Sequence, residues 1–316
     1  MQQNIKYKIV KYIQSYNQIS PFKHTTKKMK LIHKVEECAV YESNKQSYVS
    51  MSSSPSSSSS SSPQVKTFLL KITSSNANAN AALALLSSVE TSISRGHTHT
   101  SNHTSTSIKF KALKVTPLKT VIEDMHSSSQ SLSKGMAYTL TLKLLADVGT
   151  QLEHIRVERG LIIPFLSLED IIVIETRNHN QDNQNQDNQD KQEEESDDLK
   201  TEYTFIFMNA EKLMQEPRPN KKELIVDIPL KVNKHTSFLP AELPESALKR
   251  LPMRLTTTSW CYSLSALCIY ALLQHKFKNG EDDIERVGRP FLHTSLYFCL
   301  KRCLKPDPEE RVLLYV

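Results

Sequence analysis

Residues 160–175 read GLIIPFLSLEDIIVIE, and three side chains in the middle of this stretch could take part in chemistry. Ser167, Glu169 and Asp170 offer a hydroxyl and two carboxylates, and carboxylates can accept a proton in general base catalysis. They form a short polar step between two apolar runs, with no His, Arg or Lys in the stretch to assist them. The competing interpretation is that Glu169 and Asp170 are simply the polar part of a loop between two buried strands.

The remaining reactive residue types form no known site. The five cysteines contain no CxxC pair, which argues against a zinc site and against a disulfide framework. Three histidines at positions 97, 99 and 103 fall in a Ser/Thr-rich stretch, where biased composition explains them better than metal binding. No GxSxG, HExxH, GxGxxG or GxxxxGK[ST] occurs. We expect reduced, buried thiols, no metal site and an intracellular protein of the cytoplasm or nucleus.

Charge is distributed unevenly around a net value of +6. Residues 1–34 hold eight lysines and no acid, whereas residues 178–199 hold eight acids and one lysine. We expect residues 1–29 to be a basic tail without fixed structure. Two alternatives stay open for it: a mitochondrial presequence, although such segments favour arginine, and attraction to anionic surfaces.

Low-complexity stretches separate the elements that must position these residues. Residues 52–62, 74–80, 91–107 and 178–198 cannot bury enough apolar surface to offset their ordering entropy, so we predict them to be loops. Predicted strands cover 65–72, 107–117, 120–125 and 203–208, with two more in 32–49 around a turn at 42–45. Predicted helices cover 81–93, 133–159, 259–274 and 290–304. Strands first and helices later predict an α+β fold with two lobes.

Two predicted helices, 133–159 and 259–274, are expected to form the core of the helical lobe. Residues 133–159 carry one apolar face, formed by Leu140, Leu144, Val148, Leu152 and Ile155. The uncharged run 260–273 spans about 14 residues, fewer than the ~20 that a membrane helix needs. We interpret this run as a buried core helix and expect no integral membrane span.

The C-terminal segments resemble eukaryotic protein kinases. SWCYSLSALCIYALL, from Ser259, is similar to the central helix of the large kinase lobe, D-x-W-S-L-G-x-x-L-Y-x-L-L. CLKPDPEER, at 303–311, is similar to C-L-x-x-D-P-x-x-R, and FLPAEL, at 238–243, resembles the A-P-E segment with one extra residue. The resemblance implies a structural ion pair between Glu242 and Arg311.

The opening stretch then resembles the kinase catalytic loop, G-I-I-H-R-D-L-K-P-E-N-I-L-V. In this register Ile163 and Pro164 take the His and Arg places, and Phe165 takes the place of the catalytic Asp. Asp170 stands for the metal-binding Asn, a change that could still coordinate Mg²⁺. FIFMNAEKLM, from Phe205, resembles the strand leading to D-F-G, so Asn209 takes the place of its Asp.

In the small lobe, FLLKI at 68–72 resembles the V-A-I-K strand. Lys71 then matches the lysine that contacts phosphate, and Glu90 could supply its ion-pair partner. None of the six glycines precedes Lys71, so a glycine-rich loop is missing.

The resemblance implies a two-lobed protein kinase-like fold, with a small β-rich lobe at 30–126 and a large helical lobe at 127–316 carrying an acidic insert at 177–200. It implies a degenerate member, a pseudokinase of a fungal type with low-complexity inserts, that acts as a scaffold or allosteric regulator of protein partners. We expect no specific nucleic acid. One alternative is an unusual active kinase using ATP and Mg²⁺ through Lys71, Asp170 and Asn209 or Glu211. The other is a non-enzymatic protein tethered to a membrane by 260–273 and the basic tail.

Overall fold

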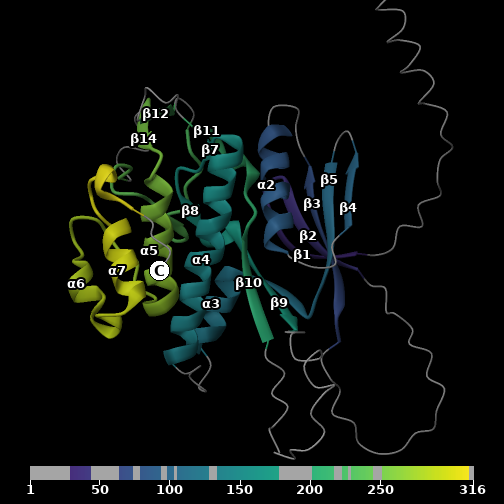
Figure 1. Cartoon of the computed structure of the whole chain (residues 1–316), viewed down its shortest axis with the longest axis horizontal. Helices are drawn as coiled ribbons and strands as arrows, with labels where there is room; N and C mark the ends of the chain where they lie inside the picture. Colours follow the sequence, from purple (N-terminus) through teal and green to yellow (C-terminus); the bar gives the residue numbers. More distant parts are fainter. Residues whose placement is uncertain are drawn as a thin grey trace, which may run out of the picture.

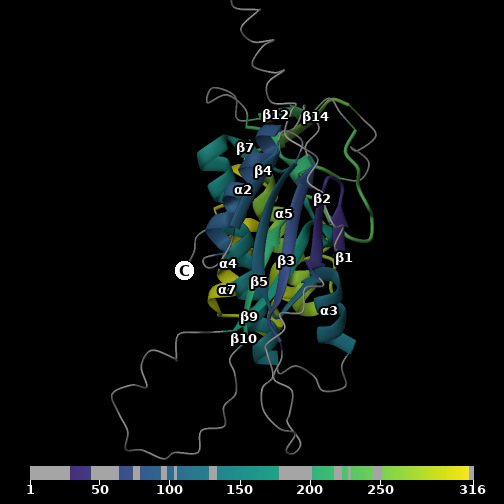
Figure 2. The ribbon, with the colours of Figure 1, turned by 90° about the vertical axis from the view of Figure 1, so that its right-hand side faces the viewer.

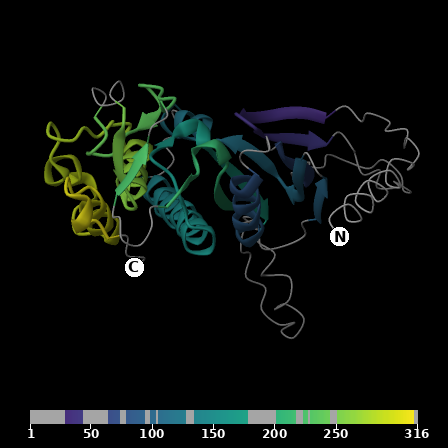
Figure 3. The ribbon, with the colours of Figure 1, turned by 90° about the horizontal axis from the view of Figure 1, so that it is seen from above.

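The computed structural model describes residues 29–43, 64–73, 79–93, 98–102, 105–127, 134–177, 201–216, 223–226, 229–244 and 251–312. In this part of the chain a β-rich region packs beside a helical region (Figure 1). Seen from above, the strands of the β-rich region and the C-terminal helices lie at opposite ends, with the long helix α4 (Lys134–Arg159) between them (Figure 3). The α+β class predicted from the sequence is confirmed.

The β-rich region is an antiparallel sheet in the order β1-β2-β3-β5-β4. Its strands are β1 (Met29–Val35), β2 (Cys38–Ser43), β3 (Lys66–Thr73), β4 (Thr98–Asn102) and β5 (Ser105–Ala112). Side chains alternate between the two faces of a strand, and Phe68, Leu70 and Ile72 of β3 are all at most 2% exposed. Helix α2 (Ala79–Ser92) lies between this buried face and α4 (Lys134–Arg159) (Figure 1).

A second sheet, in the order β10-β9-β6, joins the two regions. It contains β6 (Lys114–Pro117), β9 (Ile171–Arg177) and β10 (Thr201–Phe207), and α3 (Leu118–Ser127) follows β6. Gln151 of α4 fixes α2 and β10 together, because its side-chain amide bonds to Ser88 Oγ and to both the backbone N–H and the carbonyl of Phe207. These buried hydrogen bonds link α2, α4 and β10.

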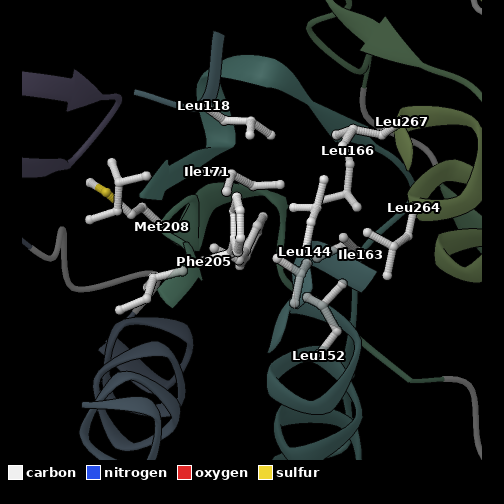
Figure 4. Packing of buried hydrophobic residues seen from close by; sticks show 14 of the residues in the cluster. Leu118, Leu144, Leu152, Ile163, Leu166, Ile171, Phe205, Met208, Leu264 and Leu267 are labelled. Atoms are coloured by element: carbon white, nitrogen blue, oxygen red, sulfur yellow. The ribbon is translucent and has the colours of Figure 1, made fainter. Parts of the chain in front are cut away.

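Short strands and helices complete the helical region. Three two-stranded pairs join β7 (Leu161–Ile162) to β11 (Met214–Gln215), β8 (Leu166–Ser167) to β13 (Ser237–Phe238), and β12 (Glu223–Val226) to β14 (Met253–Thr256). The helices are α5 (Ser259–Leu273), α6 (Ile284–Val287) and α7 (Ser295–Cys303). Leu264 and Leu267 of α5 pack near Ile163 and Leu166 of the 160–175 stretch, beside Leu144 and Leu152 of α4 (Figure 4). The predicted apolar face of α4 is buried as expected.

Helix α5 contains the longest apolar run of the sequence. The run 260–273 lies inside this helix, of which twelve residues are buried, so packing in the core accounts for its apolar composition. In the described ranges, no helix combines the length and the apolar character needed to cross a bilayer.

Several predicted elements are wrong in type or position. Residues 120–125 are helical, within α3, because Leu118, Val121, Ile122 and Met125 recur at helical spacing and pack on the core. The first hairpin turns at Glu36 and Glu37, not at 42–45, and Glu36 takes a left-handed φ of 47° there. The last helix begins at Ser295 instead of 290, since Thr294 caps it and accepts a bond from Tyr297 N.

The stretch 91–107, predicted to be a loop, also carries structure. Its Thr98–Asn102 segment is strand β4, and β5 begins at Ser105. Backbone pairing with β5 explains this strand, because Ser and Thr residues without an apolar pattern can still complete a sheet edge. The predicted loops at 52–62 and 178–198 lie outside the described residues, as do residues 1–28 of the predicted tail at 1–29. Met29 instead begins strand β1, and Ala79 and Asn80 of the predicted loop at 74–80 begin helix α2.

Candidate functional site

The 160–175 stretch places a buried polar cluster where β9 begins and β10 ends. Pairing of β9 with β10 sets Ile171 opposite Phe207, so Asp170 and Asn209 come together. Asn209 Nδ2 donates to Asp170 Oδ1 at 2.8 Å, and the Met208 backbone N–H donates to the Asp170 carbonyl at 2.7 Å. Asp170 and Asn209 are only 2% and 5% exposed. The structure thus brings together two of the residues that the sequence singled out.

Lys212 supplies the positive charge of this cluster. Its Nζ lies 2.6 Å from Asp170 Oδ2 and 2.8 Å from Ser167 Oγ. The Ser167 backbone N–H also donates to Asp170 Oδ2, at 2.7 Å, and Ser167 Oγ lies 2.8 Å from Ser237 Oγ. Three donors of the protein, Ser167 N, Asn209 Nδ2 and Lys212 Nζ, therefore bind the Asp170 carboxylate.

Phe165 closes the cluster from the apolar side. Its side chain is 1% exposed and belongs to a small core with Val226, Leu243, Met253 and Leu255. The Lys212 ammonium lies 4.1 Å from the centroid of the Phe165 ring, in cation–π contact. The position that the resemblance assigns to a proton acceptor is thus filled by an aromatic ring beneath a lysine.

Burial governs the electrostatics of Lys212. Loss of water lowers its pKa, and the neighbouring carboxylate of Asp170 opposes that shift. Charge pairing is what holds an ammonium in such a place, because an isolated buried charge is costly. One atom of the cluster, Asn209 Oδ1, is buried and has no hydrogen-bond partner.

The cluster could in principle support two kinds of chemistry, and its geometry disfavours both. A lysine beside a serine can activate the hydroxyl as a nucleophile, but Lys212 is paired with Asp170 and Ser167 is 5% exposed. A Mg²⁺ ion needs free oxygen ligands, whereas here an ammonium already sits on the carboxylate. The residues present therefore do not fit Mg²⁺, and the described ranges contain no group of three or more His, Cys, Asp or Glu residues placed to hold a metal ion.

The β1–β2 turn brings further negative charge next to the cluster. Lys231 bonds to Glu36 at 3.2 Å and lies 3.9 Å from Glu211. Burial raises the pKa of Glu211, and repulsion from Glu36 and Glu37 adds to the rise. His33 Nε2 donates to the Glu169 carbonyl at 2.8 Å, so the hairpin is fastened to the 160–175 stretch. Carboxylates, not glycine amides, therefore line this turn.

Lys71 and Glu90 are not brought together. Lys71 alternates along β3 with Phe68, Leu70 and Ile72, so its side chain belongs to the opposite face of the sheet from that buried face. Helix α2, which carries Glu90, lies on the buried side (Figure 1). No ion pair links the two side chains, although both lie in described ranges.

Glu242 and Arg311 meet in a bidentate ion pair. Arg311 Nη2 lies 2.7 Å from Glu242 Oε2, and Arg311 Nη1 lies 2.9 Å from Oε1. Burial pushes the pKa of Glu242 upward, but bonds from Arg311 and Ser259 outweigh it and hold the pKa below its usual value. The Arg311 side chain is 0% exposed, so this pair joins the segment before α5 to the end of the described chain.

Sequence reasoning missed Lys212, Ser237 and the acidic β1–β2 turn. One feature of the sequence points to Lys212: it lies three residues after Asn209, just beyond the end of the strand that resembles the one leading to D-F-G. Ser237 gave no such signal, because it reaches Ser167 only through the pairing of β13 with β8.

Comparisons with known proteins add little to these observations. No protein-family model and no curated protein matches the chain. Among solved structures, a mutant form of the kinase domain of Mycobacterium tuberculosis PknI aligns over 90% of this chain and 88% of that domain. The sequence identity is 13% and the TM-score is 0.41. Assignment of a function therefore depends on the residues of this chain.

Proposed function

We propose that this chain is a catalytically impaired protein kinase-like domain that acts as a scaffold or allosteric regulator of protein partners. The proposal covers a small lobe at residues 30–126 and a large lobe at 127–316. It starts from the resemblance of the 160–175, 238–243 and 259–311 segments to kinase motifs. The ion pair between Glu242 and Arg311, formed by residues that those motifs align, supports the same register.

The observation that carries the proposal is the Lys212 ammonium. It lies against both Asp170, which aligns with a metal-binding residue, and Phe165, which aligns with the catalytic carboxylate. Phosphoryl transfer depends on a group that accepts or orients the attacking hydroxyl and on metal ions that neutralise phosphate charge. In this cluster the aromatic ring of Phe165 aligns with the group that would accept the proton. The carboxylate of Asp170, which aligns with a metal ligand, is neutralised by the ammonium of Lys212.

The β1–β2 turn supports impaired nucleotide binding as well. In protein kinases a glycine-rich loop near the start of the small lobe covers the phosphates of ATP, and phosphate sites use backbone N–H groups and positive charge. Here Glu36 and Glu37 occupy the turn, and Glu211 lies close enough to interact with them. Lys71, the aligned phosphate-binding lysine, belongs to the other face of the sheet. Negative charge would repel the phosphates.

A thermal shift experiment tests the proposal. Purified protein is heated with ATP, with Mg²⁺, and with both together. We expect the melting temperature to show no stabilisation that requires ATP and Mg²⁺ at the same time. The Lys71→Ala variant serves as the matched control and should behave like the wild type. Metal-dependent stabilisation by ATP that Lys71→Ala abolishes would instead favour an active or nucleotide-binding kinase.

A further inference from the structure

The outward face of the five-stranded sheet is basic and lacks acidic side chains. Cross-strand pairing places Lys34 beside Ala39, Lys71 and Ser107 in one row, and Leu31 beside Tyr41, Leu69 and Lys109 in the next. Thr67 and Lys111 continue the face. We call this surface the basic sheet face and define it by Met29, Leu31, Lys34, Tyr41, Leu69, Lys71, Lys109 and Lys111.

No acid offsets the lysines of this face. The described side chains that point outward from β1, β2, β3 and β5 include four lysines and neither Asp nor Glu. Among the residues that the structure describes, no ion pair involves Lys34, Lys71, Lys109 or Lys111. By contrast, Lys66 on the opposite face pairs with Glu42 at 2.9 Å. The lysine charge of the face is therefore available to an external anion.

Apolar side chains accompany the lysines. Met29 and Leu31 are 47% and 50% exposed, and Tyr41 and Leu69 are half-buried beside them. No described helix or strand covers the face, which Figure 2 views directly. Amphipathic helices that lie in the membrane interface combine lysines and apolar side chains in the same way.

The sequence that precedes β1 extends the same charge. Residues 1–28 hold six lysines and no acid, and they lead directly into Met29 on this face. Basic residues near an anionic bilayer contribute additively to binding, whereas a nucleic acid site would need more aromatic or arginine side chains than one tyrosine. The positive charge, the exposed apolar residues and the adjoining basic segment thus favour an anionic bilayer over a nucleic acid as the partner of this face.

We propose that the basic sheet face binds the surface of an anionic phospholipid bilayer. The lysines contact the headgroups, while Met29 and Leu31 enter the interfacial layer. Binding is peripheral and depends on ionic strength, because salt screens contacts between exposed charges.

Vesicle flotation tests this proposal with the full chain. Vesicles contain phosphatidylcholine alone or phosphatidylcholine with phosphatidylserine. We expect binding to the second only, weakened by added salt. Each lysine contributes about 1 kcal/mol near such a surface, or about fivefold in affinity. The K34Q/K109Q/K111Q variant should therefore lose on the order of 100-fold in affinity.

A matched control removes three exposed lysines elsewhere, K119Q/K278Q/K305Q, and should bind vesicles like the wild type. Urea unfolding checks that both variants fold. Equal losses in the two variants would overturn the proposal, since net charge alone would then explain binding. So would retention of a DNA duplex without vesicle binding, or vesicle binding that appears only after deletion of the acidic residues 178–198.

Discussion

Replacement of Lys212 by methionine tests the polar cluster most sharply. Lys212→Met keeps most of the side-chain length but removes the ammonium that lies 2.6 Å from Asp170 Oδ2. Asp170 is 2% exposed, so its charge would remain buried without a cation. Breaking a buried ion pair from one side costs about 3–5 kcal/mol. We expect the free energy of unfolding to fall by about this amount, measured by urea unfolding with the single tryptophan, Trp260, as the fluorescent probe.

Two further variants isolate the cause. In Lys212→Met combined with Asp170→Asn, no charge is left buried, so most of the lost stability should return. Lys231→Met removes a lysine that is 79% exposed and pairs with Glu36, so it should cost no more than about 1 kcal/mol. The reasoning fails if Lys212→Met costs no more than Lys231→Met, or if adding Asp170→Asn recovers nothing.

Three further predictions follow from buried groups. Gln151→Leu leaves the N–H and the carbonyl of Phe207 unpaired and should cost about 1–3 kcal/mol or more in urea unfolding, whereas Gln215→Leu, at an exposed site, should change little. Because the folded-state pKa of Glu242 lies below its usual 4.5, the stability from its pair with Arg311 is present above that pH and is lost as pH falls through the folded value; Glu242→Gln should flatten this acid-side loss, and an unchanged pH slope would contradict the pairing. Burial raises the pKa of Cys38 to about 12, so its thiol should stay unreactive toward a disulfide reagent at pH 8 until urea unfolds the protein; rapid labelling of native Cys38 would refute this.

Periodicity predicted the elements that are held by one apolar face. The spacing of Leu140, Leu144, Val148, Leu152 and Ile155 defines α4, and all five side chains are buried. The uncharged run of α5 predicted a core helix for the same reason. Such segments are predictable because a single partner surface, the core, selects the pattern.

Elements fixed by tertiary pairing escaped prediction. Strand β4 has no apolar alternation, and its strand form depends on hydrogen bonds to β5. Helix α3 is a different case, because its helical spacing is present in the sequence from Leu118 to Met125, but the segment 120–125 alone is too short to show it. The local sequence of a strand such as β4 does not show which other strand will pair with it.

The sequence singled out some residues of the polar cluster and missed others. The resemblance aligned Phe165, Asp170 and Asn209 with kinase motif positions, and strand pairing brings Asp170 and Asn209 into contact. Lys212 could not be assigned from sequence, because a lysine after a strand is usually solvated. Only the burial of the cluster makes its ammonium the partner of Asp170. For the same reason Lys71 could not be placed, since the choice of sheet face depends on where α2 packs.

Phosphate transfer by the purified protein tests the central claim most directly. The chain is incubated with Mg²⁺ and ATP labelled on the γ-phosphate, and label on the chain itself and on a general protein substrate is measured. The proposed function aligns Phe165 with the kinase proton acceptor, and the Lys212 ammonium pairs with the Asp170 carboxylate. We therefore predict no transfer above the level of heat-denatured protein. Transfer that depends on Mg²⁺ and disappears in Lys71→Ala would contradict the account.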